Sequence, residues 1–194
     1  MEVTFTKIPG RRYVMTVVRE HGPELAPRQG PGYHDHLPHD AVHFLVEAEA
    51  RLAGGVFGRV AAGHNNLFWP ADPVARQRQA RRERKWKPGQ QEQADMGRSE
   101  ALASVCQPLW EFRAGLRGEL PPWFSRIEPG TLESPLVESI LARLGEFAAG
   151  WRPLPEHRGL TLAWPVPPRP AARPKKAART TATHRRAGAP HSFT

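Results

Sequence analysis

His39, His43 and Glu47 follow one another at four-residue intervals in a segment whose composition favours a helix. Residues four apart lie on one face of a helix, so this spacing places two imidazoles and a carboxylate in a single column. Neutral imidazole and carboxylate groups are ligands for zinc, iron or manganese, and they also carry protons in catalysis. The column therefore predicts a divalent-metal site. The sequence leaves open whether such a site would be catalytic.

The spacing limits which of these side chains can share one ion. A helix rises 1.5 Å per residue, so Glu47 lies about 12 Å along the axis from His39. The chelating pair would be His39 with His43, or His43 with Glu47. Asp40 points to another face, where it would support a histidine ligand as a hydrogen-bond partner or act as a charge in the first turn. Further candidate ligands lie on the flanking loops: His34, Asp35, His36 and His64.

The same segment also fits an ordinary amphipathic helix without a metal. In this interpretation His39 occupies a solvated first turn, His43 lies beside the core with a hydrogen-bond partner, and Glu47 is at the surface. The core face would consist of apolar residues at helical spacing, namely Val42, Leu45, Val46 and Leu52.

Two resemblances rest on this region. Residues 37–47 and 55–63 resemble the pattern LPHDxVHFxVE…GVFGRxAAG of uncharacterised proteins from high-GC bacteria, which implies a family but no activity. The His39-Asp40-x-x-His43 element resembles the HDxxH element of a family of ubiquinone-biosynthesis proteins, which implies metal ligation by both histidines. That family carries a further glutamate after its second histidine, where this chain has Gly54 and Gly55.

Positive charge is concentrated in two segments. Residues 157–194 contain eight of the 28 basic residues and no acidic residue, so they carry most of the net charge of +9. The second cluster is interrupted only by Glu83 and comprises Arg76, Arg78, Arg81, Arg82, Arg84, Lys85 and Lys87. Such runs bind phosphates, and Trp86 within the cluster could stack on a base. The alternative function is therefore non-enzymatic binding of an acidic partner or nucleic acid. The same charges would also simply keep the protein soluble.

The sequence patterns of the helices and strands that would position these residues predict an α+β fold. Alternating β-branched and aromatic residues on either side of Pro9-Gly10 predict a hairpin, to which a late strand adds. The expected strands are residues 3–8, 12–19 and 159–164, and the expected helices are 38–52, 56–62, 99–117 and 135–149. Residues 76–87 are expected as a solvated helix or a flexible arm. The expected loops are residues 20–37, 88–98 and 119–134.

We expect a single domain over residues 1–164, with residues 71–98 as a basic arm or loop insertion. Residues 165–194 are expected to form a disordered basic tail, because Pro, Ala, Arg, Lys and Thr dominate and apolar bulk is absent. Cys106 is the only cysteine, which excludes an intramolecular disulfide, and its apolar surroundings predict a buried thiol. Since neither a signal peptide nor a membrane-spanning run is evident, we expect a cytoplasmic protein that does not bind membranes.

Overall fold

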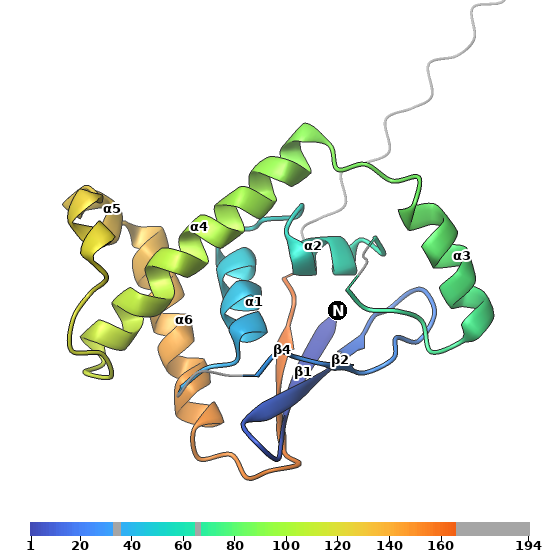
Figure 1. The fold of residues 1–194 in the computed structure, drawn as a ribbon, viewed down its shortest axis with the longest axis horizontal. Coiled ribbons are helices and arrows are strands. Elements are labelled where there is room, and N and C mark those ends of the chain that lie inside the picture. The colour runs from blue at the N-terminus through green and yellow to red at the C-terminus, as the bar shows by residue number, and fades with distance from the viewer. Residues whose placement is uncertain (33–35, 65–66, 166–194) are drawn as a thin grey trace, which may run out of the picture.

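The structure is a computed structural model that describes residues 1–32, 36–64 and 67–165. The predicted basic tail, apart from Pro165, and two candidate ligands, His34 and Asp35, lie outside the described residues. Within them, the chain forms a sheet and a set of helices that cover one of its faces (Figure 1).

The sheet has four antiparallel strands in the order β3-β2-β1-β4. Strands β1 (Glu2–Ile8) and β2 (Arg12–Val18) form the predicted hairpin, with Phe5 opposite Met15. Strand β4 (Gly159–Ala163) returns from the far end of the chain and pairs with β1. The short strand β3 (Arg28–Gln29), in a segment expected to be loop, extends the sheet beyond β2. The predicted α+β fold with a small antiparallel sheet is confirmed.

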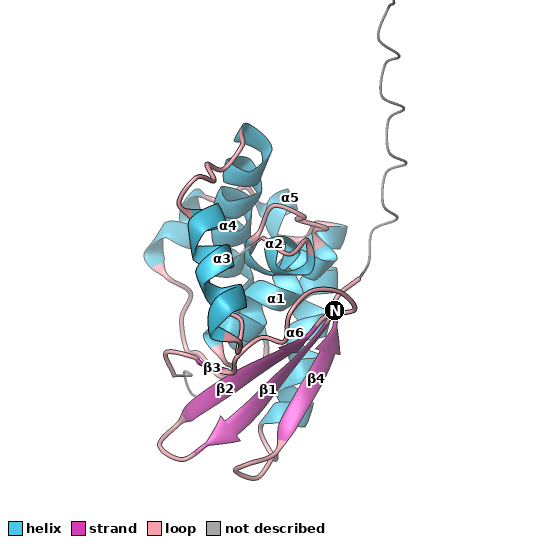
Figure 2. Cartoon of the chain, turned by 90° about the vertical axis from the view of Figure 1, so that its right-hand side faces the viewer, coloured by secondary structure: helices cyan, strands magenta, loops and turns pink. Residues whose placement is uncertain are grey.

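The two faces of the sheet differ in polarity, as the alternation of the sequence predicts. Val3, Phe5, Tyr13 and Met15 point to one face and are fully buried. The other face carries threonines, and the hydroxyl oxygens of Thr4 on β1 and Thr161 on β4 lie 2.8 Å apart. Figure 2 shows the helices gathered on the apolar side of the three long strands.

Four predicted helices are present with shifted ends. They are α1 (His39–Glu49), α2 (Val56–Ala61), α4 (Gln90–Arg113) and α6 (Pro135–Trp151). The basic segment forms a further helix, α3 (Pro73–Glu83), which begins with the Asp72 side chain accepting a hydrogen bond from Ala75 N at 2.6 Å. The basic segment is therefore largely helical, one of the two forms expected for it.

Two segments expected to be loop contain helices. Helix α4 begins nine residues before Ser99, in a polar segment. Its first turn is capped, because Gly89 N donates to the Glu92 side chain at 2.7 Å, and Asp95 in the next turn is buried against the body of the protein. Pro108 lies inside α4 without ending it. Residues 119–134 contain two short helices that each begin with a proline, where the missing N–H costs nothing. They are η1 (Pro122–Arg126) and α5 (Pro129–Leu132).

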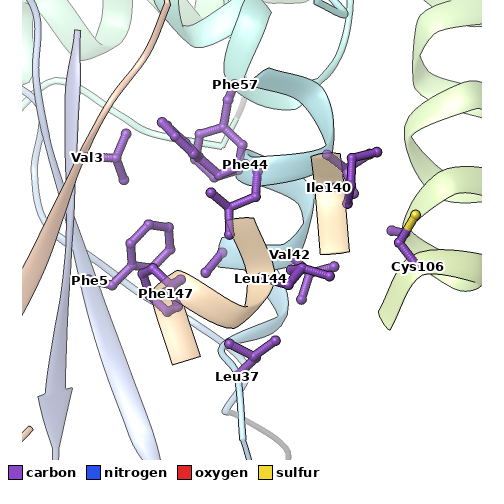
Figure 3. Close-up of a cluster of buried hydrophobic side chains, with 14 of the residues drawn as sticks. Val3, Phe5, Leu37, Val42, Phe44, Phe57, Cys106, Ile140, Leu144 and Phe147 are labelled. Atoms are coloured by element: carbon purple, nitrogen blue, oxygen red, sulfur yellow. The ribbon is translucent and has the colours of Figure 1, made fainter. Parts of the chain in front are cut away.

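One hydrophobic core lies between the sheet and the helices (Figure 3). The Phe5 ring of β1 meets the rings of Phe44 on α1 and Phe147 on α6 edge-on, at centroid distances of 6.4 and 5.7 Å. Cys106 of α4 is buried as expected, and burial raises the pKa of its thiol to about 12. None of the helices within the described ranges is long and apolar enough to cross a membrane. Helix α1 lies in the middle of this core, which decides the surroundings of its polar residues.

Candidate functional site on helix α1

Helix α1 carries the predicted column from the surface into the core. Its residues 41–47 are buried, while His39 in the first turn is exposed. The rings of His39 and His43 meet edge-on with centroids 4.6 Å apart. His43 is 6% exposed and Glu47 is 0% exposed. The column therefore passes from solvent at His39 to complete burial at Glu47. The interpretation without a metal placed His39 in solvent and His43 beside the core, as the structure does, but it was wrong to place Glu47 at the surface.

The buried Glu47 carboxylate caps another helix. Its Oε1 accepts a hydrogen bond from Val56 N at 2.9 Å, and its Oε2 accepts one from Phe57 N at 2.8 Å. These are first-turn amides of α2, whose own N-cap, Gly55, has no side chain to accept them. A carboxylate at a helix N-terminus also interacts favourably with the helix dipole. Glu47 thus connects α1 to α2 through the core.

This capping is possible because the backbone at Gly54 and Gly55 passes very close to α1 and α4. A Cβ atom on Gly55 would lie 2.4 Å from Glu47 Cδ, well inside van der Waals contact. A Cβ on Gly54 would lie 2.7 Å from Glu92 Cα, and Gly54 N donates to Asp95 Oδ2 at 2.8 Å. The two glycines thus allow the turn before α2 to pack against both α1 and α4.

Ser99 of α4 joins Glu47 to His43. Its hydroxyl donates to Glu47 Oε1 at 2.9 Å, and its Oγ lies 3.2 Å from His43 Nδ1. A serine hydroxyl has one hydrogen. Because Glu47 takes that hydrogen, Nδ1 of His43 must be the donor to Ser99. In the neutral ring Nε2 then keeps its lone pair, so this hydrogen-bond chain selects one tautomer of His43.

The surroundings favour the neutral imidazole. Burial lowers the pKa of His43, and the neighbouring His39 lowers it further, while Glu100 and Asp40 act in the opposite direction. Nε2 of His43 lies 3.9 Å from Oε2 of Glu100, a largely exposed side chain of α4. Burial also raises the pKa of Glu47, against the effect of its hydrogen-bond donors. In the tautomer that donates to Ser99, Nε2 is the ring nitrogen without a hydrogen, and it has the His39 ring and the Glu100 carboxylate as neighbours.

Asp40 contacts the sheet. The Tyr13 hydroxyl of β2 donates to Asp40 Oδ2, and Arg28 NH1 lies 3.8 Å from Oδ1. Burial raises the pKa of Tyr13, and the Asp40 charge raises it further. Asp40 therefore anchors the first turn of α1 to β2 and β3.

The remaining candidate ligands are separate from the column. His36 lies beside Trp110, with ring centroids 6.4 Å apart, in a surface pocket that also contains Glu111 and Arg117. His64 is exposed after the end of α2. Over the described ranges, no three His, Cys, Asp or Glu side chains are arranged so that they could hold a metal ion together.

The predicted basic residues lie on α3 and in the segment that follows it. Arg76 donates from Nε to Pro70 O at 3.1 Å, which ties it to the preceding loop. Gln79 is the one residue of α3 that is buried, and its amide donates to Phe68 O at 3.1 Å. The other six basic residues of the cluster are exposed: Arg78, Arg81, Arg82, Arg84, Lys85 and Lys87.

Sequence reasoning did not identify Ser99 and Glu100. They lie more than 50 residues from the column, on a helix whose register against α1 no local pattern encodes. The sequence carried a weak signal for the capping role of Glu47. A helix that begins after two glycines lacks a side chain to cap it, so it requires a hydrogen-bond acceptor from elsewhere in the chain.

Comparisons of the chain with family models, curated proteins and solved structures give no match.

Proposed function

We propose that His39 and His43 bind a divalent cation at the surface end of the α1 column. The observation that supports this most directly is the Glu47–Ser99–His43 hydrogen-bond chain. In metal sites a ligating histidine commonly donates its other ring N–H to a fixed acceptor, which sets the tautomer and the ring orientation. Nδ1 of His43 lies 3.2 Å from the Ser99 hydroxyl oxygen. When Nδ1 donates to that oxygen, Nε2 of the neutral ring has a lone pair for an ion.

Two neighbours of His43 would complete the ligand set once their side chains move, since the described residues hold no ready group of three ligands. His39 is exposed and its ring is next to that of His43, so a small side-chain rotation would bring a second nitrogen to the ion. Oε2 of Glu100 lies 3.9 Å from Nε2, and the Glu100 side chain is 67% exposed and therefore able to move closer. Two imidazoles and one carboxylate form a ligand set typical of zinc and also suited to iron or manganese.

Glu47 has a supporting role in this proposal. Both of its carboxylate oxygens already accept hydrogen bonds, and it lies one turn deeper than His43. It therefore holds Ser99 while the ligands lie closer to the surface. Water would complete the coordination of the ion, and a zinc-bound water is more acidic than bulk water.

Metal titration of the full chain, prepared without a histidine tag, tests the proposal. We expect one Zn²⁺ or Mn²⁺ per chain by calorimetry at pH 7.5. Either of two variants should weaken binding at least about tenfold. His39→Ala removes an exposed ligand, and His43→Asn removes Nε2 but keeps a donor toward Ser99. His21→Ala, an exposed histidine on another loop, is the matched control.

Two outcomes of the metal titration would count against the proposed site. Absence of binding by the parent chain, or an equal loss in the His21→Ala control, would contradict the proposal. Binding should also weaken as the pH falls below about 6, because the histidine ligands must be deprotonated.

A further inference from the structure

Helix α3 presents positive charge in a fixed orientation. Its capping aspartate and the buried Gln79 amide define which side of the helix faces the body of the protein. Arg78, Arg81 and Arg82 lie at helical spacing on a side that is exposed, and Lys85 follows in the turn that continues the helix, where its N–H donates to Arg82 O. Figure 1 shows α3 at one edge of the molecule, away from α5 and α6. We call these four residues together with Arg19 the basic face.

Arg19 joins the basic face from the end of β2. One guanidinium nitrogen donates to Pro23 O at 3.2 Å, whereas its buried Nε has no hydrogen-bond partner over the described ranges. Burial lowers the pKa of Arg19, and the charge of Arg82 lowers it further. Bringing two guanidinium groups together costs free energy unless an anion neutralises them.

Arg59 of α2 adds a second incompletely paired guanidinium beside the helix. Its guanidinium lies over the Trp86 ring, 3.8 Å from the centroid, and NH2 is 3.8 Å from Glu83 Oε2. Its Nε and NH2 are buried and make no hydrogen bond to any residue the structure describes. Glu83 is therefore the acidic residue of α3, and its carboxylate lies at ion-pair distance from Arg59.

We propose that the basic face binds the phosphate backbone of nucleic acid. Arginine predominates on it, and the planar guanidinium fork matches the geometry of phosphate oxygens. By helix rise, Arg78 and Lys85 are about 10 Å apart, which corresponds to about three base-pair steps along the axis of a duplex. Val74 is the one large apolar residue exposed on α3. An interface of this composition is typical of nucleic acid, whereas the centre of a protein–protein interface is usually more apolar.

Salt dependence of binding by the full chain tests the proposal. The variant Arg78→Gln/Arg81→Gln/Arg82→Gln is compared with Arg126→Gln/Arg152→Gln/Arg158→Gln, which removes the same charge from exposed positions on η1 and after α6. Residues 165–194 are identical in both variants, so a difference between the variants does not come from the predicted basic tail. The probes are a labelled mixed-sequence DNA strand and its duplex, and polyglutamate serves as competitor.

We expect the first variant to bind about tenfold or more weakly at low salt, and to lower the slope of log K against log salt on duplex by about 2 to 3. The control variant should keep most of the affinity and slope of the parent chain. Equal losses in the two variants would overturn the proposal, as would polyglutamate that competes as well as DNA at equal charge. Comparison of the strand with the duplex identifies the preferred form of nucleic acid.

Discussion

Helices α1 and α3 have the same length and carry five ionisable residues each, yet the surroundings of these residues are opposite. On α1, the carboxylate of Glu47 is buried and each of its oxygens accepts hydrogen bonds from the protein itself. On α3, the arginines are exposed, and the charge of Arg82 lowers the pKa of Arg19. The comparison teaches that the buried carboxylate of α1 holds the fold together, whereas the arginines of α3 are left for solvent or a partner.

Replacement of Glu47 should have the largest effect on stability. Glu47→Gln keeps the size of the side chain but turns an amide NH₂ toward groups that donate hydrogen bonds. Leaving such buried donors without an acceptor costs about 1–3 kcal/mol each, so we expect a loss of about 3 kcal/mol or more in urea denaturation. Glu146→Gln, at an exposed position on α6, is the control. A loss below about 1 kcal/mol would show that Glu47 is not structural.

Ser99→Ala should have an intermediate effect. It removes the hydroxyl between His43 and Glu47, so we expect a loss of about 1–2 kcal/mol in the free energy of unfolding. If the proposed metal site exists, the metal affinity should also fall about tenfold, because His43 is no longer oriented. Ser104→Ala on the exposed side of the same helix should change neither quantity appreciably. An unchanged metal affinity for Ser99→Ala would separate the hydrogen-bond chain from metal binding.

The pH dependence of stability should identify His43. Its pKa is lowered in the folded state, so between the ordinary value near 6.5 and the lowered value the unfolded chain binds more protons. Stability therefore falls as the pH decreases through this range. The raised pKa of Glu47 acts with the opposite sign, favouring the folded state toward acid. Subtracting the profile of His43→Asn, measured by urea denaturation, isolates the His43 contribution. A parent profile no steeper than that of the variant would contradict this assignment.

Changes on α3 should have the smallest effect on folding. Arg78→Gln/Arg81→Gln/Arg82→Gln removes exposed charges, so the free energy of unfolding should stay within about 0.5 kcal/mol of the parent. Relief of the repulsion between Arg82 and Arg19 would make any shift stabilising at low salt. Thermal melts in low and high salt measure the change in stability and its dependence on salt. A destabilisation above about 1 kcal/mol would show that the arginines of α3 also support the fold, as Glu47 of α1 does.

The sequence predicted those features that depend on local periodicity. The hairpin, the late strand and four helices followed from apolar spacing and turn residues, and the His39–His43 pair followed from the helical repeat. The first turns of α4 were expected to be loop because they contain almost no apolar residue. They are stabilised instead by the Glu92 cap and by Asp95, which accepts a hydrogen bond from Gly54 N.

Contacts between distant segments could not be predicted in the same way. Ser99 meets Glu47 only because α4 crosses α1 at a particular register, and that register is a property of the whole core. The burial of Glu47 depends equally on α2, whose uncapped amides lie nine residues further along the chain.

The approach of Gly55 to Glu47 limits how this sequence can change over generations. A side chain at position 55 would meet the carboxyl carbon of Glu47 at 2.4 Å, and a shorter residue at position 47 would leave the α2 amides without their acceptor. Either substitution alone passes through a chain that folds less stably. Descendants of this sequence should therefore keep glutamate and glycine at these positions together, or exchange both together for another way of capping α2.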